Sequence, residues 1–140
     1  MNRIWSALVA VPLGLSACGG YTAPTDTGNM APPTAAPNDI HIVVGASALM
    51  ATAFNPNPKV VSLAGNPSVT VRWVNSDISG GDYSSGTATI HNITSDNAAF
   101  TPSGTLGGNA TYSVTLTAAG DYPYHCQIHP NMVGTVTVNP

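Results

Sequence analysis

Charged residues are scarce in this chain. Of its 140 residues 6% are charged, namely three Lys or Arg and six Asp, and there is no Glu. So few cations cannot form a basic surface that neutralises phosphates, which excludes nucleic acid as the expected partner. The carboxylates are scattered along the chain, so no pair for acid–base catalysis can be argued from them. They are Asp26, Asp39, Asp77, Asp82, Asp96 and Asp121.

A hydrophobic run long enough to cross a membrane is absent from the start of the chain. Arg3 is followed by a short apolar stretch that Pro12 and Gly14 interrupt, a pattern typical of a signal peptide, here predicted over residues 1–17. The sequence Leu15-Ser16-Ala17-Cys18 resembles the bacterial lipoprotein signal, in which the Cys is acylated and anchors the protein to the membrane. The alternative is an ordinary secretory signal that is cleaved nearby. Either one predicts a chain that works outside the cytoplasm, in the periplasm or at the cell surface.

Large apolar residues are nearly missing from the next segment, residues 18–38, which consists mainly of Gly, Pro, Thr, Ala and Asn. Such a composition cannot bury enough surface to offset the entropy lost on ordering, so we expect a disordered membrane tether. The folded domain is predicted to cover residues 39–140.

Clear helical patterns are also missing, except for a turn or two over residues 46–53. Segments rich in β-branched or aromatic residues recur instead, separated by Gly, Pro, Ser and Asn. The predicted strands are 40–44, 59–63, 68–75, 87–93, 111–117, 121–126 and 133–139. Many short strands at such spacing predict an all-β sandwich of about seven to eight strands. Its core would use Val, Ile and Leu together with Phe54, Trp73 and Phe100.

Cysteine occurs twice, at Cys18 and Cys126. Two cysteines in an exported protein would ordinarily suggest a disulfide. Here Cys18 lies in the lipidation sequence and Cys126 in a ligand-rich loop, and a bridge would remove the thiolate that the loop presents. We therefore expect no disulfide.

The sequence from Cys126 to Met132 carries a thiolate, an imidazole and a thioether at intervals of three, with His129 in the middle. This set suits copper better than zinc, calcium or magnesium. A trigonal site needs a second imidazole, for which His91 is the candidate. Two His, one Cys and a weak axial Met form the blue-copper arrangement, which serves electron transfer.

The remaining His and Met residues are not predicted to bind the metal. In a strand that directs Cys126, Tyr124 and Tyr122 to one face, His125 points to the other face. His41 lies in the first strand, far from the loop, and is expected at the surface or hydrogen-bonded. Met50 is interpreted as a core gap-filler and Met30 as a tether residue.

The string Tyr-His-Cys-x-x-His-Pro-x-Met, with His91-Asn92 upstream, resembles the cupredoxins, and amicyanin more than plastocyanin because the ligand loop is short. The similarity runs from about Asp39 to the C-terminus. The chain departs from the family pattern at Ile90, where such proteins usually have Pro, and in a polar insertion from Ser79 to Gly86.

The resemblance implies a Greek-key cupredoxin sandwich with one type 1 copper ion bound by His91, Cys126, His129 and Met132. It also implies that the N–H of Asn92 donates to Cys126. Redox partner proteins would dock weakly at an apolar surface around His129, and the protein would be a monomer. The ligand set is complete without a substrate position, so no enzyme activity is expected.

Two alternatives stay open at this point. The same four ligands could serve a protein that buffers or delivers copper at the cell surface, although the chain lacks the additional Met-rich or His-rich tracts that sequestration usually calls for. A metal-free adhesive or structural sandwich is the other alternative, and it would leave the ligand spacing as a coincidence.

Overall fold

A computed structural model describes residues 33–78 and 89–140. The predicted signal peptide, Cys18, Met30, most of the predicted tether and the insertion from Ser79 to Gly86 lie outside these residues. The strands are β1 (Asp39–Ile42), β2 (Phe54–Asn55), β3 (Lys59–Ser62), β4 (Val69–Asn75), β5 (Thr94–Ser95), β6 (Thr111–Leu116), β7 (Gly120–His125) and β8 (Val133–Asn139). Two short 3-10 helices are η1 (Ala46–Ala48) and η2 (Met50–Thr52).

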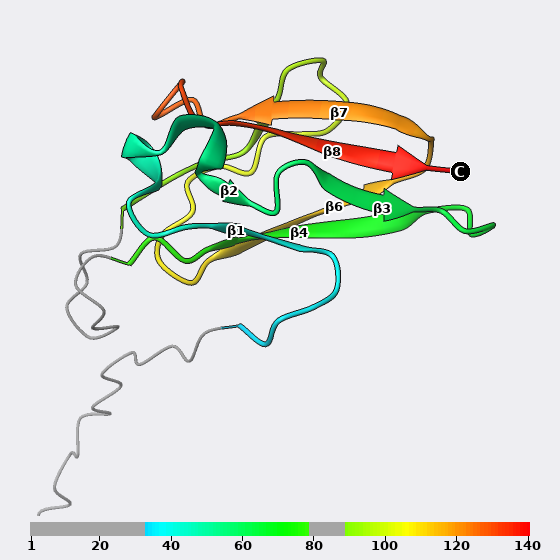
Figure 1. Cartoon of the computed structure of the whole chain (residues 1–140), viewed down its shortest axis with the longest axis horizontal. Coiled ribbons are helices and arrows are strands. Elements are labelled where there is room, and N and C mark those ends of the chain that lie inside the picture. The colour runs from blue at the N-terminus through cyan, green and yellow to red at the C-terminus, as the bar shows by residue number, and fades with distance from the viewer. Residues whose placement is uncertain (1–32, 79–88) are drawn as a thin grey trace, which may run out of the picture.

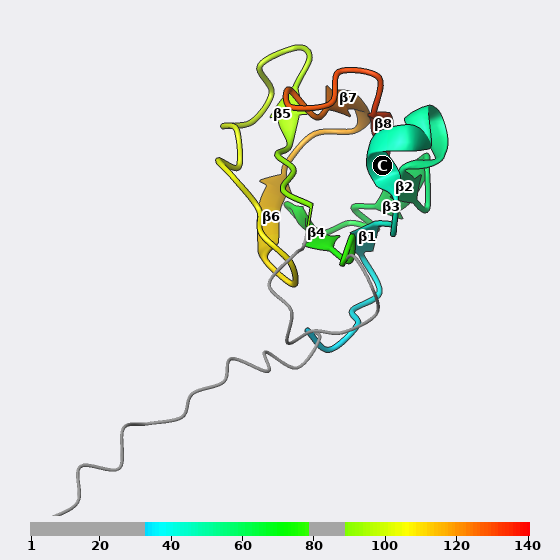
Figure 2. The same cartoon turned by 90° about the vertical axis from the view of Figure 1, so that its left-hand side faces the viewer.

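The strands form two facing four-stranded sheets, which Figures 1 and 2 show from the side and from one end. One sheet has the order β2-β1-β4-β6 and the other β3-β8-β7-β5. Strand β1 pairs in parallel with β4, and β3 with β8, while the other pairs are antiparallel. The all-β sandwich predicted from the sequence is confirmed.

Alternation along the strands determines which side chains fill the space between the sheets. In β4, Val71 and Trp73 are fully buried, and in β7 Tyr124 is fully buried on the same face as Cys126 just beyond the strand end. Burying each large apolar side chain stabilises the fold by about 1.5–3 kcal/mol. Alternation therefore holds from Val71 to Trp73 in β4 and from Tyr124 to Cys126 at the end of β7.

An aromatic cluster occupies the centre of the sandwich. The Tyr124 ring packs edge-on against Phe54, at 4.9 Å between centroids, and against Trp73, at 5.1 Å. Phe100 lies half-buried against Trp73. Gly134 in β8 lies opposite Tyr124, and its missing side chain leaves the space that the ring fills. The cluster thus fixes β7 just before Cys126.

The predicted strand 87–93 is wrong for its described residues. Residues 89 and 90 are irregular, His91 forms an isolated bridge with Leu106, and a two-residue strand follows at β5. The hydrogen bonds of this segment go partly to side chains, since Asn75 Nδ2 lies 2.8 Å from the Thr89 carbonyl oxygen and the N–H of Ile93 donates to Ser103 Oγ. The backbone is therefore satisfied without a regular ladder.

Residues 33–38, which the sequence assigned to the tether, contact the sandwich. Arg72 forms a bidentate ion pair with Asp39 and donates to the carbonyl oxygen of Thr34 at 2.6 Å. Lys59 donates to the carbonyl oxygen of Pro37 at 2.6 Å. The hydrogen bond from Arg72 holds the pKa of Asp39 below its ordinary value. The two cations of the described chain thus hold the segment that leads into β1.

No helix in the described part of the chain has the length and apolar character needed to cross a bilayer.

Candidate metal centre

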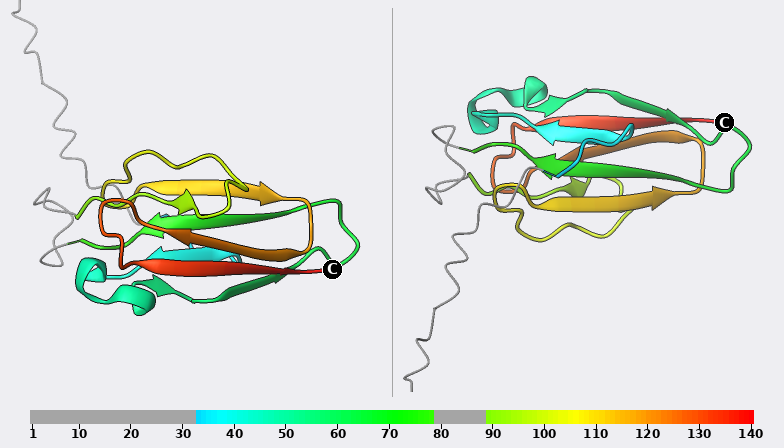
Figure 3. Two further views of the ribbon diagram at one scale, coloured as in Figure 1. Left: turned by 90° about the horizontal axis from the view of Figure 1, so that it is seen from above. Right: turned by 90° about the horizontal axis from the view of Figure 1, so that it is seen from below.

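The loop between β7 and β8 is closed by its own backbone. The N–H of Cys126 donates to the carbonyl oxygen of Met132 at 3.0 Å, and the N–H of Met132 donates to that of His129 at 2.9 Å. Figure 3 shows from two sides that this loop lies at the same end of the sandwich as η1 and η2. The bonds hold Cys126, His129 and Met132 in one tight turn.

Three donor atoms converge at this end. Cys126 Sγ lies 3.9 Å from His91 Nδ1 and 3.8 Å from His129 Nδ1, and the two Nδ1 atoms are 3.2 Å apart. A point equidistant from atoms with these separations lies about 2.1 Å from each, within the ~2.0–2.3 Å range of zinc bonds to imidazole nitrogen and thiolate sulfur. The three donors therefore leave room for one metal ion between them, and two imidazoles with a thiolate form a set that suits copper.

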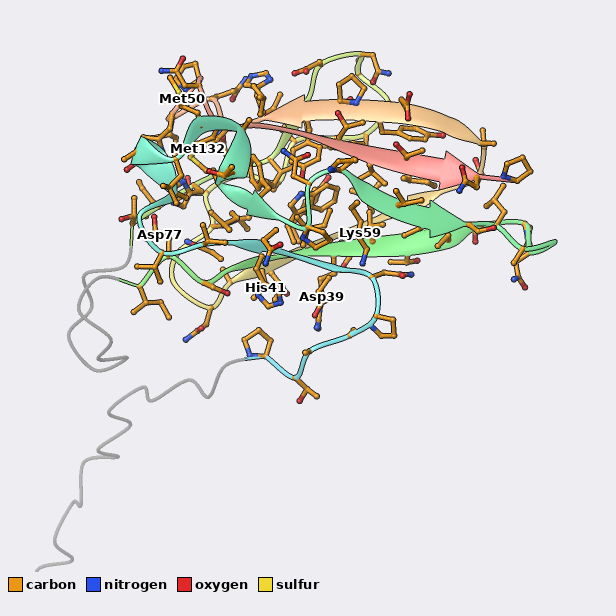
Figure 4. The ribbon with its side chains drawn as sticks, in the orientation of Figure 1. Asp39, His41, Met50, Lys59, Asp77 and Met132 are labelled. Atoms are coloured by element: carbon orange, nitrogen blue, oxygen red, sulfur yellow. The ribbon has the colours of Figure 1, made fainter. Side chains whose placement is uncertain are left out.

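Met132, the fourth residue singled out by the sequence, is fully buried at the same end. Figure 4 labels it above Asp77 and below the exposed Met50. Its main chain is hydrogen-bonded to the main chains of Cys126 and His129, as described above. Its role as an axial ligand stays a prediction.

The three converging residues differ in exposure. His91 and Cys126 are fully buried, whereas His129 is half-buried. His129 is thus the residue of this cluster that reaches the surface.

Hydrogen bonds hold both the backbone and the ring of His91. Its N–H and carbonyl oxygen pair with Leu106, at 3.1 and 2.8 Å. Its Nε2 lies 2.9 Å from Oδ2 of Asp77, so Nδ1 is left facing Cys126. Asp77 was missed from the sequence, because it lies 14 residues before His91 and was one of six scattered carboxylates. No local motif marks this pair.

Asn92 joins the two segments that carry the donors. Its N–H donates to Cys126 Sγ at 3.5 Å, and its side-chain oxygen accepts from the N–H of Gln127 at 2.7 Å. The first of these contacts is the one that the cupredoxin resemblance implied for Asn92.

The surroundings of Cys126 favour its thiolate. Burial raises the pKa of the thiol. Hydrogen bonds with His91, the Asn92 N–H and His129 lower this pKa by more than burial raises it, and the result is a pKa of about 6. For His91, burial lowers the pKa, and the hydrogen bonds to Cys126 and Asp77 raise it above the ordinary value. In the metal-free site the sulfur of Cys126 is therefore mainly the thiolate at neutral pH, which is the form that binds metals.

We expect the ultraviolet thiolate absorbance of the metal-free protein to appear with a midpoint near pH 6, rather than near the ordinary thiol value of 9.0. Because the folded-state pKa is lowered, the thiolate is present above this midpoint and lost as the pH falls through it. Copper uptake at pH values well above 6 should then displace almost no thiol proton. The Cys126→Ser variant supplies the baseline for the titration, and a midpoint near 9 would contradict the described geometry.

The other His and Met residues in the described part of the chain lie outside the cluster. His41 Nδ1 hydrogen-bonds with Ser76 Oγ, and His125 pairs with Asp96 on the outer face of β7. Both agree with the expectation of hydrogen-bonded or surface residues. The interpretation of Met50 as a core residue is wrong, because it begins the exposed helix η2 and the residue is 57% exposed.

Helix η2 is held against the start of β8 by one side chain. Asn57 Nδ2 lies 2.7 Å from the carbonyl oxygen of Ala51 and 3.0 Å from that of Val133. The exposed Leu49 and Met50 are therefore close to the ligand loop, a neighbourhood that the sequence did not predict.

Solved structures of known proteins share this fold. A structure described as a novel purple cupredoxin from Nitrosopumilus maritimus is 24% identical, with a TM-score of 0.57, covering 72% of this chain and 98% of its own. A reduced Cu(I) form of an amicyanin variant at pH 4 is 24% identical, with a TM-score of 0.50 and coverage of 76% and 87%. An oxidised amicyanin variant is 21% identical, with a TM-score of 0.55 and coverage of 78% and 88%.

No curated protein was found to match the chain. The family of copper-binding proteins of the plastocyanin/azurin type matches residues 41–139, which is most of the chain and includes all four candidate ligands. The chain therefore belongs to the plastocyanin/azurin family of copper-binding proteins.

Proposed function

We propose that this protein is an extracytoplasmic electron carrier that binds one copper ion through His91, Cys126, His129 and Met132. The convergence of His91, Cys126 and His129 in a largely buried cluster is the observation that carries the proposal. Copper, when bound, supplies a couple that takes up and releases one electron. The role of the chain is to hold the ligands in one arrangement and to keep water away.

Each of these tasks has a structural basis. Two of the three donors are fully buried, and the closed loop, the Leu106 bridge and the Asn92 bonds restrict how far the ligands can move. Cu(I) and Cu(II) ordinarily prefer different geometries, so a restricted site keeps the rearrangement between them small. The N–H of Asn92 that points at Cys126 Sγ adjusts the electron density of the thiolate.

Electrons would enter and leave at His129. His129 is the half-buried member of the cluster, and the neighbouring Ile128 is 41% exposed. Ile90, next to the other imidazole, and Met50 on η2 are also exposed. Because these side chains carry no charge, we propose weak, mostly apolar docking of redox partners, with little dependence on ionic strength.

Electron self-exchange tests the proposal without a known partner, because a second copy of the protein serves as donor or acceptor. We expect Ile128→Lys to slow self-exchange, measured by NMR line broadening in mixtures of the reduced and oxidised protein, by on the order of tenfold at low salt, since two like charges would meet at the contact. The loss should recover as salt is added.

Val60→Lys is the matched control. Val60 is 55% exposed in β3 and pairs with Thr137, away from the ligand loop. Its substitution should leave self-exchange unchanged. Equal slowing by both variants would contradict docking at His129. Transfer of the metal to an apo-acceptor, with no electron exchange in the wild type, would support copper delivery instead.

We also propose that the protein is held at a bacterial membrane through a lipid on Cys18. The support is the sequence leading from Leu15 to Cys18 and the scarcity of large apolar residues in the segment that follows. The domain would then act as a monomer close to the membrane surface.

A further inference from the structure

Asp77 is a buried carboxylate that contacts Nε2 of His91, whereas Nδ1 of the same ring faces Cys126. Its side chain is 3% exposed and that of its partner His91 is 0% exposed. Oδ2 lies 2.9 Å from His91 Nε2, and Oδ1 accepts the N–H of Gly45 at 2.7 Å. Figure 4 shows Asp77 at the same end of the molecule as Met132. Both carboxylate oxygens are therefore used as acceptors.

The position of Asp77 is fixed by its own neighbours. The fully buried Asn75 accepts the N–H of Asp77 through Oδ1 at 3.0 Å. The amide nitrogen of Asn75 lies within 2.8–3.1 Å of the carbonyl oxygens of Thr89, Leu106 and Gly107. The Asp77 carbonyl oxygen accepts from the N–H of Thr89 at 3.1 Å. The carboxylate and the backbone that carries His91 thus belong to one hydrogen-bonded unit.

We propose that Asp77 is a positioning residue that accepts the Nε2–H of His91, keeps Nδ1 free to bind copper, and stabilises Cu(II) relative to Cu(I). The proposal rests on the proposed ligand role of His91. A carboxylate hydrogen-bonded to a ligating imidazole fixes its tautomer and raises its basicity.

The negative charge of Asp77 also stabilises Cu(II) relative to Cu(I). In the described residues, the cations Lys59 and Arg72 hydrogen-bond to the segment that leads into β1, whereas the partner of the Asp77 carboxylate is the His91 ring. A fixed negative charge attracts a doubly charged ion more strongly than a singly charged one, and burial weakens the screening by water. The carboxylate therefore lowers the reduction potential of the site.

Asp77→Asn is the direct test, because an amide has one oxygen for two donors. Either Gly45 N–H or His91 Nε2–H would then face an NH₂ group. We expect the affinity for Cu(II), measured by competition with chelators, to fall by about 10–100-fold, the usual effect of removing such a partner, and that for Cu(I) to fall less. A tenfold fall in the ratio of the two affinities raises the reduction potential by about 59 mV.

Asp96→Asn is the matched control, since Asp96 forms the other carboxylate–histidine pair, with His125 at the surface. It should leave both affinities and the potential unchanged. An equal loss of Cu(I) and Cu(II) affinity in Asp77→Asn, or the same shift in Asp96→Asn, would overturn the proposal.

A second measurement needs no variant. Nitrogen NMR of the metal-free wild type at alkaline pH should show the neutral His91 ring protonated at Nε2, whereas protonation at Nδ1 would overturn the proposal. Together with the self-exchange measurement, these results distinguish the proposed role of Asp77 from the proposed electron-carrier function. Shifted affinities without electron exchange would refute the carrier function and leave the role of Asp77 intact, whereas rapid exchange with unshifted affinities would do the reverse.

Discussion

Replacing Cys126 with serine is expected to abolish the intense visible colour of the oxidised copper-loaded protein and to lower its Cu(I) affinity by more than about 100-fold. The thiolate is the soft ligand of the site, and losing even an outer partner of a metal ligand costs 10–100-fold. A serine hydroxyl stays protonated at neutral pH and is a hard donor. Absorbance spectra and Cu(I) competition with a chelator measure both effects.

Cys18→Ser is the matched control, because it removes the other cysteine of the chain. It should leave colour and Cu(I) affinity unchanged while the copper domain stays folded by circular dichroism. If Cys126→Ser kept its colour, or if colour depended on Cys18, the proposed ligand set would be refuted.

Replacing Gly134 with alanine is expected to destabilise the domain by about 1–3 kcal/mol, the usual cost of overpacking a core. An added Cβ would lie 2.5 Å from both Cζ and the hydroxyl oxygen of Tyr124. The ring cannot swing away freely, because Phe54 and Trp73 pack against it. Thermal unfolding should show a melting temperature lower by on the order of 10 °C.

Gly107→Ala is the control for this substitution, since a Cβ there meets no atom within 4 Å. It should unfold close to the wild-type temperature. Combining Gly134→Ala with Tyr124→Val should cost less than the sum of the two single changes, because the smaller side chain removes the clash. Additive costs, or an unchanged melting temperature in Gly134→Ala, would show that Tyr124 does not fill this space.

The strands that carry the core could be predicted because their pattern is local. Alternation in β4 places Val71 and Trp73 on the buried face, and the strand at β7 directs Tyr124 and Cys126 inward, as expected. The parallel pairing of β1 with β4 joins residues 33 positions apart, from Asp39 to Arg72, and no local signal specifies it.

The segment around His91 could not be predicted as it stands. Its composition is typical of a strand, but Asn75 and Ser103 supply hydrogen-bond partners from distant parts of the chain. Such side-chain partners replace a neighbouring strand, so a rule based on composition assigns too much regular structure here.

The candidate site shows the same division between local and long-range information. The spacing of Cys126, His129 and Met132 follows from a single tight loop, which a motif can capture. Asp77 comes close to His91 through the fold, across a segment with no shared pattern. Met50, interpreted from the sequence as a core gap-filler, lies instead in the exposed helix η2, where Asn57 hydrogen-bonds to the carbonyl oxygen of Ala51.

A crystal structure of the oxidised copper-loaded protein, with anomalous scattering recorded at the copper edge, tests the central claim most directly. We expect one copper ion about 2 Å from Nδ1 of His91, Nδ1 of His129 and Sγ of Cys126, with the sulfur of Met132 facing it at a longer distance. An ion bound elsewhere, for example at His41 or His125, or a chain that takes up no copper, would contradict the account.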